Sequence, residues 1–193
     1  MDKKSKKILI IITILIVILF GFLINNKYSD IQSSNSETIE EPKEEIVYSD
    51  DFEELISQLN TSARLVDFLN DNFTYSPRVG SNALSPEEFF EEKKGGAQDF
   101  ASFASYVLHK NGFISFSFVY ESKGNTYYAV SLRDTDLPKY IYFDNEGAHI
   151  VSHGWSFRDL CQKEEERLGI KIERYGTVSP TSTNLEPQEW VNY

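Results

Sequence analysis

Residues 95–112 read GGAQDFASFASYVLHKNG, and this stretch decides the fold. Two glycines break any preceding helix, and apolar residues then recur three and four positions apart, which is the spacing of one helix face. These positions are Phe100, Phe103, Ala104, Val107 and Leu108. Asn111 and Gly112 end the pattern because both tolerate left-handed backbone. The stretch therefore predicts a helix from Ala97 to about residue 110 that buries one face in a core.

Helices are predicted before this stretch and strands after it. Helical spacing or capping signals occur at 51–59, 62–73 and 85–94. Alternating or aromatic segments, separated by turn residues, follow at 113–120, 126–133, 140–144, 148–153 and 170–175, and one more helix is predicted at 156–168. This order predicts an α+β domain, with N-terminal helices packed on a small antiparallel sheet.

Composition narrows the classes of function. A chain of 193 residues has room for one ordinary domain. Its net charge of −11 repels phosphate backbones, so we expect no nucleic-acid partner. A single cysteine excludes an intrachain disulfide framework. One cysteine and three histidines are also too few to make a structural zinc site expected. We therefore expect no metal and no other cofactor.

The first 24 residues predict the location of the chain. Residues 1–7 form a basic stub, and the uncharged apolar run at 8–24 is just long enough to span a bilayer. The basic flank favours a cytoplasmic N-terminus, which places the rest of the chain outside the cytoplasm. A cleaved signal peptide is the alternative, but no small-residue cleavage site follows the run. We expect an uncleaved signal anchor in the cell membrane, with a single pass.

A tether and a tail are predicted on either side of the domain. Residues 25–48 are polar and acidic and hold few apolar positions, so they read as a linker. Residues 28–193 carry 14 Lys and Arg and 29 Asp and Glu, a net of −15, which would keep them off an anionic membrane surface. The domain is predicted at 49–176 and a C-terminal tail at 177–193.

The segment 85–146 carries a family resemblance. Its helix opening is Gly-Gly-Ala-Gln-Asp-Phe-Ala at 95–101, its strand entry is Asn-Gly-Phe at 111–113, and the next two strands hold Tyr-Tyr-Ala-Val at 127–130 and Tyr-Ile-Tyr-Phe-Asp at 140–144. This order resembles the transglutaminase-like superfamily, which has the papain-like cysteine protease fold. In that pattern the helix opens with the nucleophilic cysteine, the second strand supplies histidine and the third supplies aspartate.

The resemblance also implies that the catalytic triad is degenerate. Ala97 stands at the position of the cysteine, Tyr128 at that of the histidine, and only Asp144 keeps its identity. A methyl group cannot attack a substrate, and a phenol with a pKa near 10 is a weak base at neutral pH. Asp144 is left to accept a hydrogen bond, which we expect from Tyr128 if their strands are adjacent. The chain then resembles a pseudoenzyme whose cleft binds a peptide, a cell-wall component or a partner protein.

Four further residues are candidates for lining such a groove. They are Gln98, Tyr127, Tyr142 and Trp155. Aromatic side chains combine a large contact area with a polar tip and are enriched at binding sites.

Two other functions remain open at this point. An active hydrolase or acyltransferase would use a displaced nucleophile, Cys161, with His149 or His153 beside it. A purely structural domain of a membrane complex would show a broad apolar patch and no concave site. Cys161 itself is expected to be a small buried residue, and the run at 164–166, Glu-Glu-Glu, a solvated helix face.

Overall fold

The computed structural model describes residues 47–133 and 138–193. The predicted basic stub, membrane-spanning segment and nearly all of the predicted linker lie outside these residues and stay predictions. Within the two described ranges, none of the helices combines the length and the apolar character needed to cross a bilayer.

The predicted helices and strands occur in the predicted order, and three short strands, β1, β2 and β8, were not predicted. The helices are α2 (Phe52–Gln58), α3 (Ser62–Asn72), α4 (Pro86–Glu92), α5 (Ala97–Lys110) and α6 (Phe157–Leu168). The strands are β1 (Thr74–Tyr75), β2 (Lys94–Gly95), β3 (Ile114–Ser122), β4 (Asn125–Arg133), β5 (Pro138–Asp144), β6 (Gly147–Ser152), β7 (Arg174–Val178) and β8 (Val191–Asn192).

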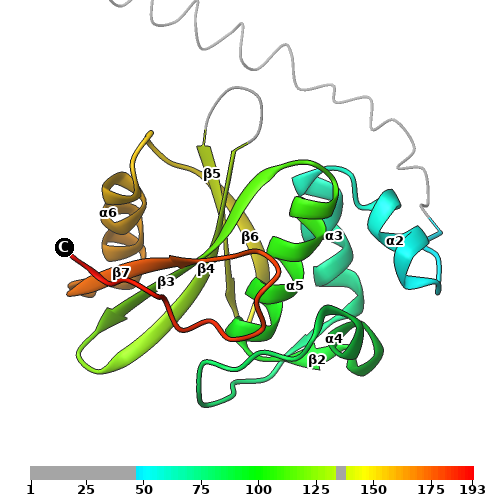
Figure 1. Cartoon of the computed structure of the whole chain (residues 1–193), viewed down its shortest axis with the longest axis horizontal. Coiled ribbons are helices and arrows are strands. Elements are labelled where there is room, and N and C mark those ends of the chain that lie inside the picture. The colour runs from blue at the N-terminus through cyan, green and yellow to red at the C-terminus, as the bar shows by residue number, and fades with distance from the viewer. Residues whose placement is uncertain (1–46, 134–137) are drawn as a thin grey trace, which may run out of the picture. The chain divides into compact units, whose positions relative to one another are not determined.

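Six of these strands form one antiparallel sheet in the order β6-β5-β4-β3-β7-β8 (Figure 1). The hairpin between β3 and β4 turns through Lys123 and Gly124, both at positive φ. Two such residues give a turn whose twist matches that of the flanking strands. The α+β prediction is confirmed.

The helix predicted at 85–94 is shorter than expected. It begins as predicted, with Ser85 and Glu88 forming a capping box, but it ends at Glu92 because Lys93 is left-handed, at φ 55°. Lys94 and Gly95 then pair in parallel with β1 as strand β2. The Lys93 ammonium lies 3.4 Å from the centre of the Phe90 ring, a cation–π contact that favours this conformation.

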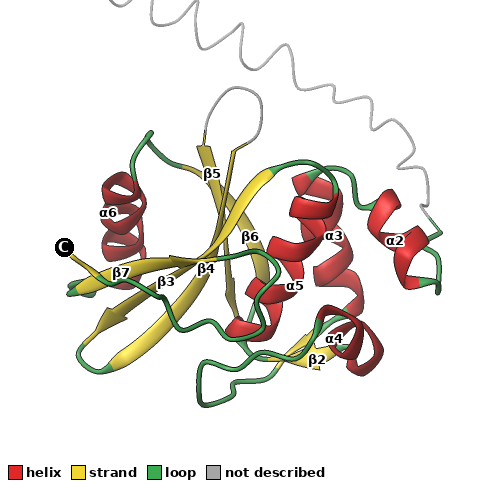
Figure 2. Ribbon diagram, in the orientation of Figure 1, coloured by secondary structure: helices red, strands yellow, loops and turns green. Residues whose placement is uncertain are grey.

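Each face of the sheet is covered by different helices (Figure 2). Helices α3 and α5 cover one face, where Tyr128, Val130 and Phe143 join the larger core. Helix α6 covers the other face, where Ala129 and Tyr140 pack with Leu160. Side chains of β4 and β5 therefore alternate between two cores, as the twofold repeat of a strand requires.

The segment predicted as a C-terminal tail packs on the sheet and on the loop before α4. The expected domain boundary at 176 falls inside β7, which begins at Arg174 instead of near residue 170. Beyond β7, Ala83 N donates to Thr183 O, Leu185 N donates to Ser81 O, and the Leu185 side chain is fully buried. Backbone pairing, more than apolar content, holds this polar segment in place.

Candidate functional site

The start of helix α5 is organised by a buried carboxylate. Asp99 has no exposed surface, and its Oδ2 accepts from Gly96 N at 2.7 Å. Its Oδ1 accepts from Arg78 Nη1 and from Leu84 N, both at 2.8 Å. One carboxylate thus caps the helix and ties down the loop between β1 and α4, which closes over the helix start.

The residues at the expected groove are therefore enclosed. Ala97, the first residue of α5, is half-buried, and Gln98 is 2 % exposed. The Nε2 of Gln98 has no hydrogen-bond partner among the described residues. A Cβ built on Gly96 would lie 2.6 Å from Gln98 Oε1 and 3.0 Å from Arg78 N. Gln98 fills the space beside the helix start instead of lining an open groove.

Tyr128 also serves to close this region. Its hydroxyl donates to Gly80 O at 3.2 Å, which fixes the same loop from the side of the sheet. Burial raises the pKa of the Tyr128 phenol, and the negative charge of Glu186 raises it further. The group stays protonated at neutral pH and acts as a hydrogen-bond donor.

Asp144 lies elsewhere. Its Oδ1 is 3.1 Å from His149 Nε2, and its Oδ2 is 4.0 Å from Arg167 Nη1 of α6. Asp144 therefore belongs to the α6 face, whereas Tyr128 belongs to the α5 face. The expected hydrogen bond between Tyr128 and Asp144 is replaced by their bonds to Gly80 and His149.

The other groove candidates are dispersed. Tyr127 stacks on Tyr120, with ring centres 5.2 Å apart, on the α6 face. The centre of the Tyr142 ring lies 3.8 Å from the guanidinium carbon of Arg167, and the ring stacks on His149. Trp155 is 63 % exposed in the loop before α6. Tyr127 and Tyr142 therefore lie on the α6 face of the sheet, whereas Gln98 belongs to α5 on the other face.

The only thiol is buried in the smaller core. Cys161 has no exposed surface, and burial, followed by the charge of Glu165, raises its pKa to about 12. Of the candidate partners, His149 is engaged by Asp144, and His153 packs edge-on against Tyr140. Burial lowers the pKa of His153, although backbone groups of Ser156 and Lys139 favour its charged form. A buried neutral thiol of this kind is a structural residue.

A polar cluster under α6 was missed from sequence. Glu164, expected on a solvated face, has no exposed surface. Its carboxylate accepts a hydrogen bond from the Tyr120 hydroxyl and two from Arg167, at 2.8 Å from Nε and 2.6 Å from Nη2. The signal was the helical stripe itself, since Leu160, Cys161 and Glu164 are spaced as one face. These charge-assisted bonds fasten α6 to the sheet.

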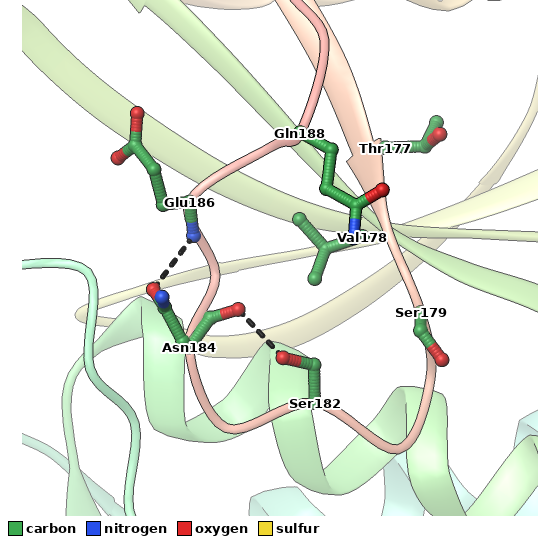
Figure 3. A pocket seen from close by; sticks show the side chains of 7 residues that line it. All are labelled: Thr177, Val178, Ser179, Ser182, Asn184, Glu186 and Gln188. Carbon is green, nitrogen blue, oxygen red and sulfur yellow. Dashed lines mark hydrogen bonds between the residues drawn. The ribbon is translucent and has the colours of Figure 1, made fainter.

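A polar hollow of about 330 Å³ lies inside the loop after β7 (Figure 3). It is lined by Thr177, Val178, Ser179, Ser182, Asn184, Glu186 and Gln188. The loop is held by bonds within itself, from Ser182 Oγ to Asn184 O and from Glu186 N to Asn184 Oδ1. Hydroxyl and amide groups of this kind can bind polar ligands, but none is an activated nucleophile.

Exposed apolar side chains gather where β3 begins. Ile114 is 59 % and Phe116 39 % exposed, and both line a hollow of about 170 Å³ together with Trp155. The Arg133 guanidinium carbon lies 5.0 Å from the Trp155 ring centre. We call Ile114, Phe116, Arg133 and Trp155 the β3-edge surface. Clustered exposed apolar groups with an aromatic and an arginine are typical of protein-binding surfaces.

No metal centre is found in the part of the chain that the structure describes. Within residues 47–133 and 138–193, no three His, Cys, Asp or Glu side chains are grouped so that they could hold an ion.

Comparison with known proteins gives a distant likeness of fold. No protein-family model and no curated protein sequence matches the chain. Three solved structures of LapG from Legionella pneumophila match it at 16 % sequence identity, and they include a calcium-bound form and an EGTA-treated form. Their TM-scores are 0.39, 0.40 and 0.40, over 58 %, 65 % and 64 % of this chain and 61 %, 70 % and 68 % of LapG. A likeness of this size supports no statement about the chemistry of this chain.

Proposed function

We propose that this chain is a membrane-anchored, extracytoplasmic binding module without cysteine-hydrolase chemistry, and that it takes a peptide or a partner protein at the β3-edge surface. The observation that carries the proposal is the exposure of Ile114, Phe116 and Trp155 around one hollow. Exposed apolar groups cost solvation free energy, so a cluster of them is most simply kept for a partner that covers it.

The arrangement of the family-equivalent positions supports a role other than catalysis. Ala97 offers no nucleophile, Tyr128 is a buried donor, and Asp144 lies on the other face of the sheet. Catalysis by nucleophile and base needs the two groups within hydrogen-bond reach of one another. In this proposal the transglutaminase-like fold is a scaffold, and the binding surface lies away from the family's cleft.

The location rests on the sequence. The apolar run at 8–24 and its basic flank favour a domain outside the cytoplasm, on a polar tether. A fusion of alkaline phosphatase to residue 193, which is active only outside the cytoplasm, tests this orientation. An active fusion is expected, and an inactive fusion at equal expression would reverse the orientation.

A thiol-labelling experiment tests the claim that the chain lacks cysteine chemistry. The full chain, held in phosphatidylcholine nanodiscs, is treated with iodoacetamide in native buffer and in urea, and labelling is read by mass. We expect Cys161 to be labelled only in urea, because it is buried and its pKa is about 12. Native labelling faster than that of free cysteine would reveal an activated thiolate and would restore the displaced-nucleophile hypothesis.

A further inference from the structure

The pairing of strand β3 is incomplete on one side. Its residues from Ile114 to Ser122 all pair with β4, but β7 pairs only with 117–121. Continuing the β7 register from Ser117↔Val178 by two residues would place Pro180 opposite Ser115. Proline has no backbone N–H and cannot continue a ladder. Among the described residues, the outer edge of 114–116 therefore has no strand partner.

Two hollows flank this free edge. One, of about 330 Å³, is lined by residues that include His109, Phe113, Phe116 and Pro180. The other, of about 170 Å³, is lined by Ile114, Phe116, Trp155 and their neighbours. Successive side chains of a strand point to opposite faces of its sheet. A strand added at 114–116 would thus direct alternate side chains towards the two hollows.

The described residues that line the two hollows are less acidic than the chain as a whole. The net charge is −11, yet the described residues that line the two hollows include no Asp or Glu. Their one permanent charge is Arg133, which pairs with Ile114 across the β3–β4 ladder. An added strand would run about 10 Å from β4, two strand spacings. A glutamate on that strand could reach the Arg133 guanidinium.

We propose that an extended acidic peptide segment adds as an antiparallel or parallel strand to the free edge of β3 at Ile114–Phe116. Its apolar side chains point to the hollow beside Pro180, and its carboxylates point to the other hollow, against Arg133. The inference rests on the proposed binding function and specifies its partner and mode. Backbone pairing supplies affinity in such complexes, and the pockets for alternate side chains supply specificity.

The test uses peptides of defined chemistry. A fluorescein-labelled peptide of three Glu-Val repeats is titrated with the full chain in phosphatidylcholine nanodiscs, and anisotropy is measured. A peptide of three Lys-Val repeats and a fully N-methylated Glu-Val peptide serve as matched controls. We expect the Glu-Val peptide to bind at least about tenfold more tightly than either control. A benzoylphenylalanine in place of its central valine should cross-link to 114–116.

Two charge reversals complete the test. Arg133→Glu should abolish the preference for Glu-Val over Lys-Val, because the exposed arginine is the group that selects the carboxylate. Lys123→Glu makes the same change at the far end of β3 and should leave binding within about twofold. Circular dichroism checks that both variants keep the fold.

Several outcomes would overturn the inference. Equal binding of the N-methylated peptide would mean side-chain docking without strand addition. Cross-links to the loop 179–188, or no binding of any peptide at about 1 mM, would reject the edge as the site. Equal binding of the N-methylated peptide would leave binding at the β3-edge surface standing, whereas cross-links to the loop 179–188 would overturn that part of the proposed function as well. Fast native labelling of Cys161 tests the absence of cysteine chemistry independently of both.

Discussion

Tyr128 and Asp144 lie on opposite faces of the six-stranded sheet. Ala129 pairs with Tyr142, so the next step of the register sets Tyr128 beside Phe143, and Tyr127 beside Asp144. Tyr128 and Phe143 belong to the core under α5, whereas Asp144 approaches Arg167 of α6. Only a shift of one residue in strand register would bring the two side chains to the same face. In this fold the Tyr128 hydroxyl and the Asp144 carboxylate therefore cannot share a hydrogen bond.

Removal of the buried carboxylate under α6 should destabilise the domain. Glu164→Ala leaves Arg167 without its main partner and removes the acceptor of the Tyr120 hydroxyl. Loss of one member of a buried ion pair costs about 3 kcal/mol of unfolding free energy. Urea denaturation followed by near-ultraviolet circular dichroism measures it.

The matched control on the same helix is Glu166→Ala. Glu166 is 55 % exposed and pairs only with Lys163 and Gln162 at the surface, so its loss should cost under about 0.5 kcal/mol. Equal costs for the two variants would contradict a structural role for Glu164.

The domain should lose stability at alkaline pH. Burial raises the pKa of Cys161 from 9.0 to about 12, and it raises the pKa of Tyr120 well above 10.0. Above pH 9 the unfolded chain releases protons that the folded chain retains, so the unfolding free energy falls as the pH rises. Each such group contributes about 1.4 kcal/mol per pH unit between its two pKa values. Urea denaturation at a series of pH values measures the slope.

Cys161→Ala separates the thiol from the phenols. Between pH 9 and 10 the cysteine is the first of these groups to ionise in the unfolded chain, so the variant should show a shallower slope in that interval. Identical slopes for the variant and the parent chain would mean that the thiol is accessible in the folded state.

Substitution of Asp99 should release the loop over α5. Asp99→Ala removes the acceptor of Gly96 N, Leu84 N and Arg78 Nη1 and leaves buried donors unpaired. Each unpaired buried donor costs about 1–3 kcal/mol, so a loss of about 3 kcal/mol is expected. Hydrogen exchange should speed up in 76–84. Asp67→Ala, at an exposed position of α3, is the control and should leave exchange in that loop unchanged.

Gly147→Ala should be more damaging than Gly112→Ala. Both glycines have positive φ, at +126° and +84°, but an added Cβ at Gly147 would collide with Asn70 Oδ1, whereas nothing lies within 4 Å at Gly112. Asn70 bonds both backbone groups of Ala148 and links α3 to β6. At Gly112 backbone strain alone should lower the unfolding free energy by about 1 kcal/mol. At Gly147 strain together with loss of the Asn70–Ala148 hydrogen bonds should lower it by about 3 kcal/mol. Thermal unfolding of both variants tests this difference, and equal melting temperatures would contradict a stabilising role for the Asn70–Ala148 hydrogen bonds.

Local signals in the sequence predicted most of the elements. The stripe of 95–108 gave α5, Ser85 with Glu88 gave the start of α4, and Ser156 with Asp159 gave the start of α6. The end of α4 at Glu92 and the pairing of Lys94 with Thr74 were missed, because the parallel bridge, and the hydrogen bond from Thr74 N to Lys93 O beside it, join segments distant in the chain. The burial of Glu164 was missed because this residue begins a run of three glutamates, and such a run is typical of a solvated helix face. Only its contacts with the sheet show that its side chain is buried.

The sequence by itself determined the order of most helices and strands, the alternation of faces along β3, and the methyl side chain at the start of α5, since these follow from residue type and period. Only the tertiary structure decided that Asp144 faces α6, that the polar segment after β7 closes on the loop before α4, and that the start of β3 keeps a free edge beside Trp155. These features depend on strand register and on contacts between segments far apart in the chain, and a local pattern carries no record of either.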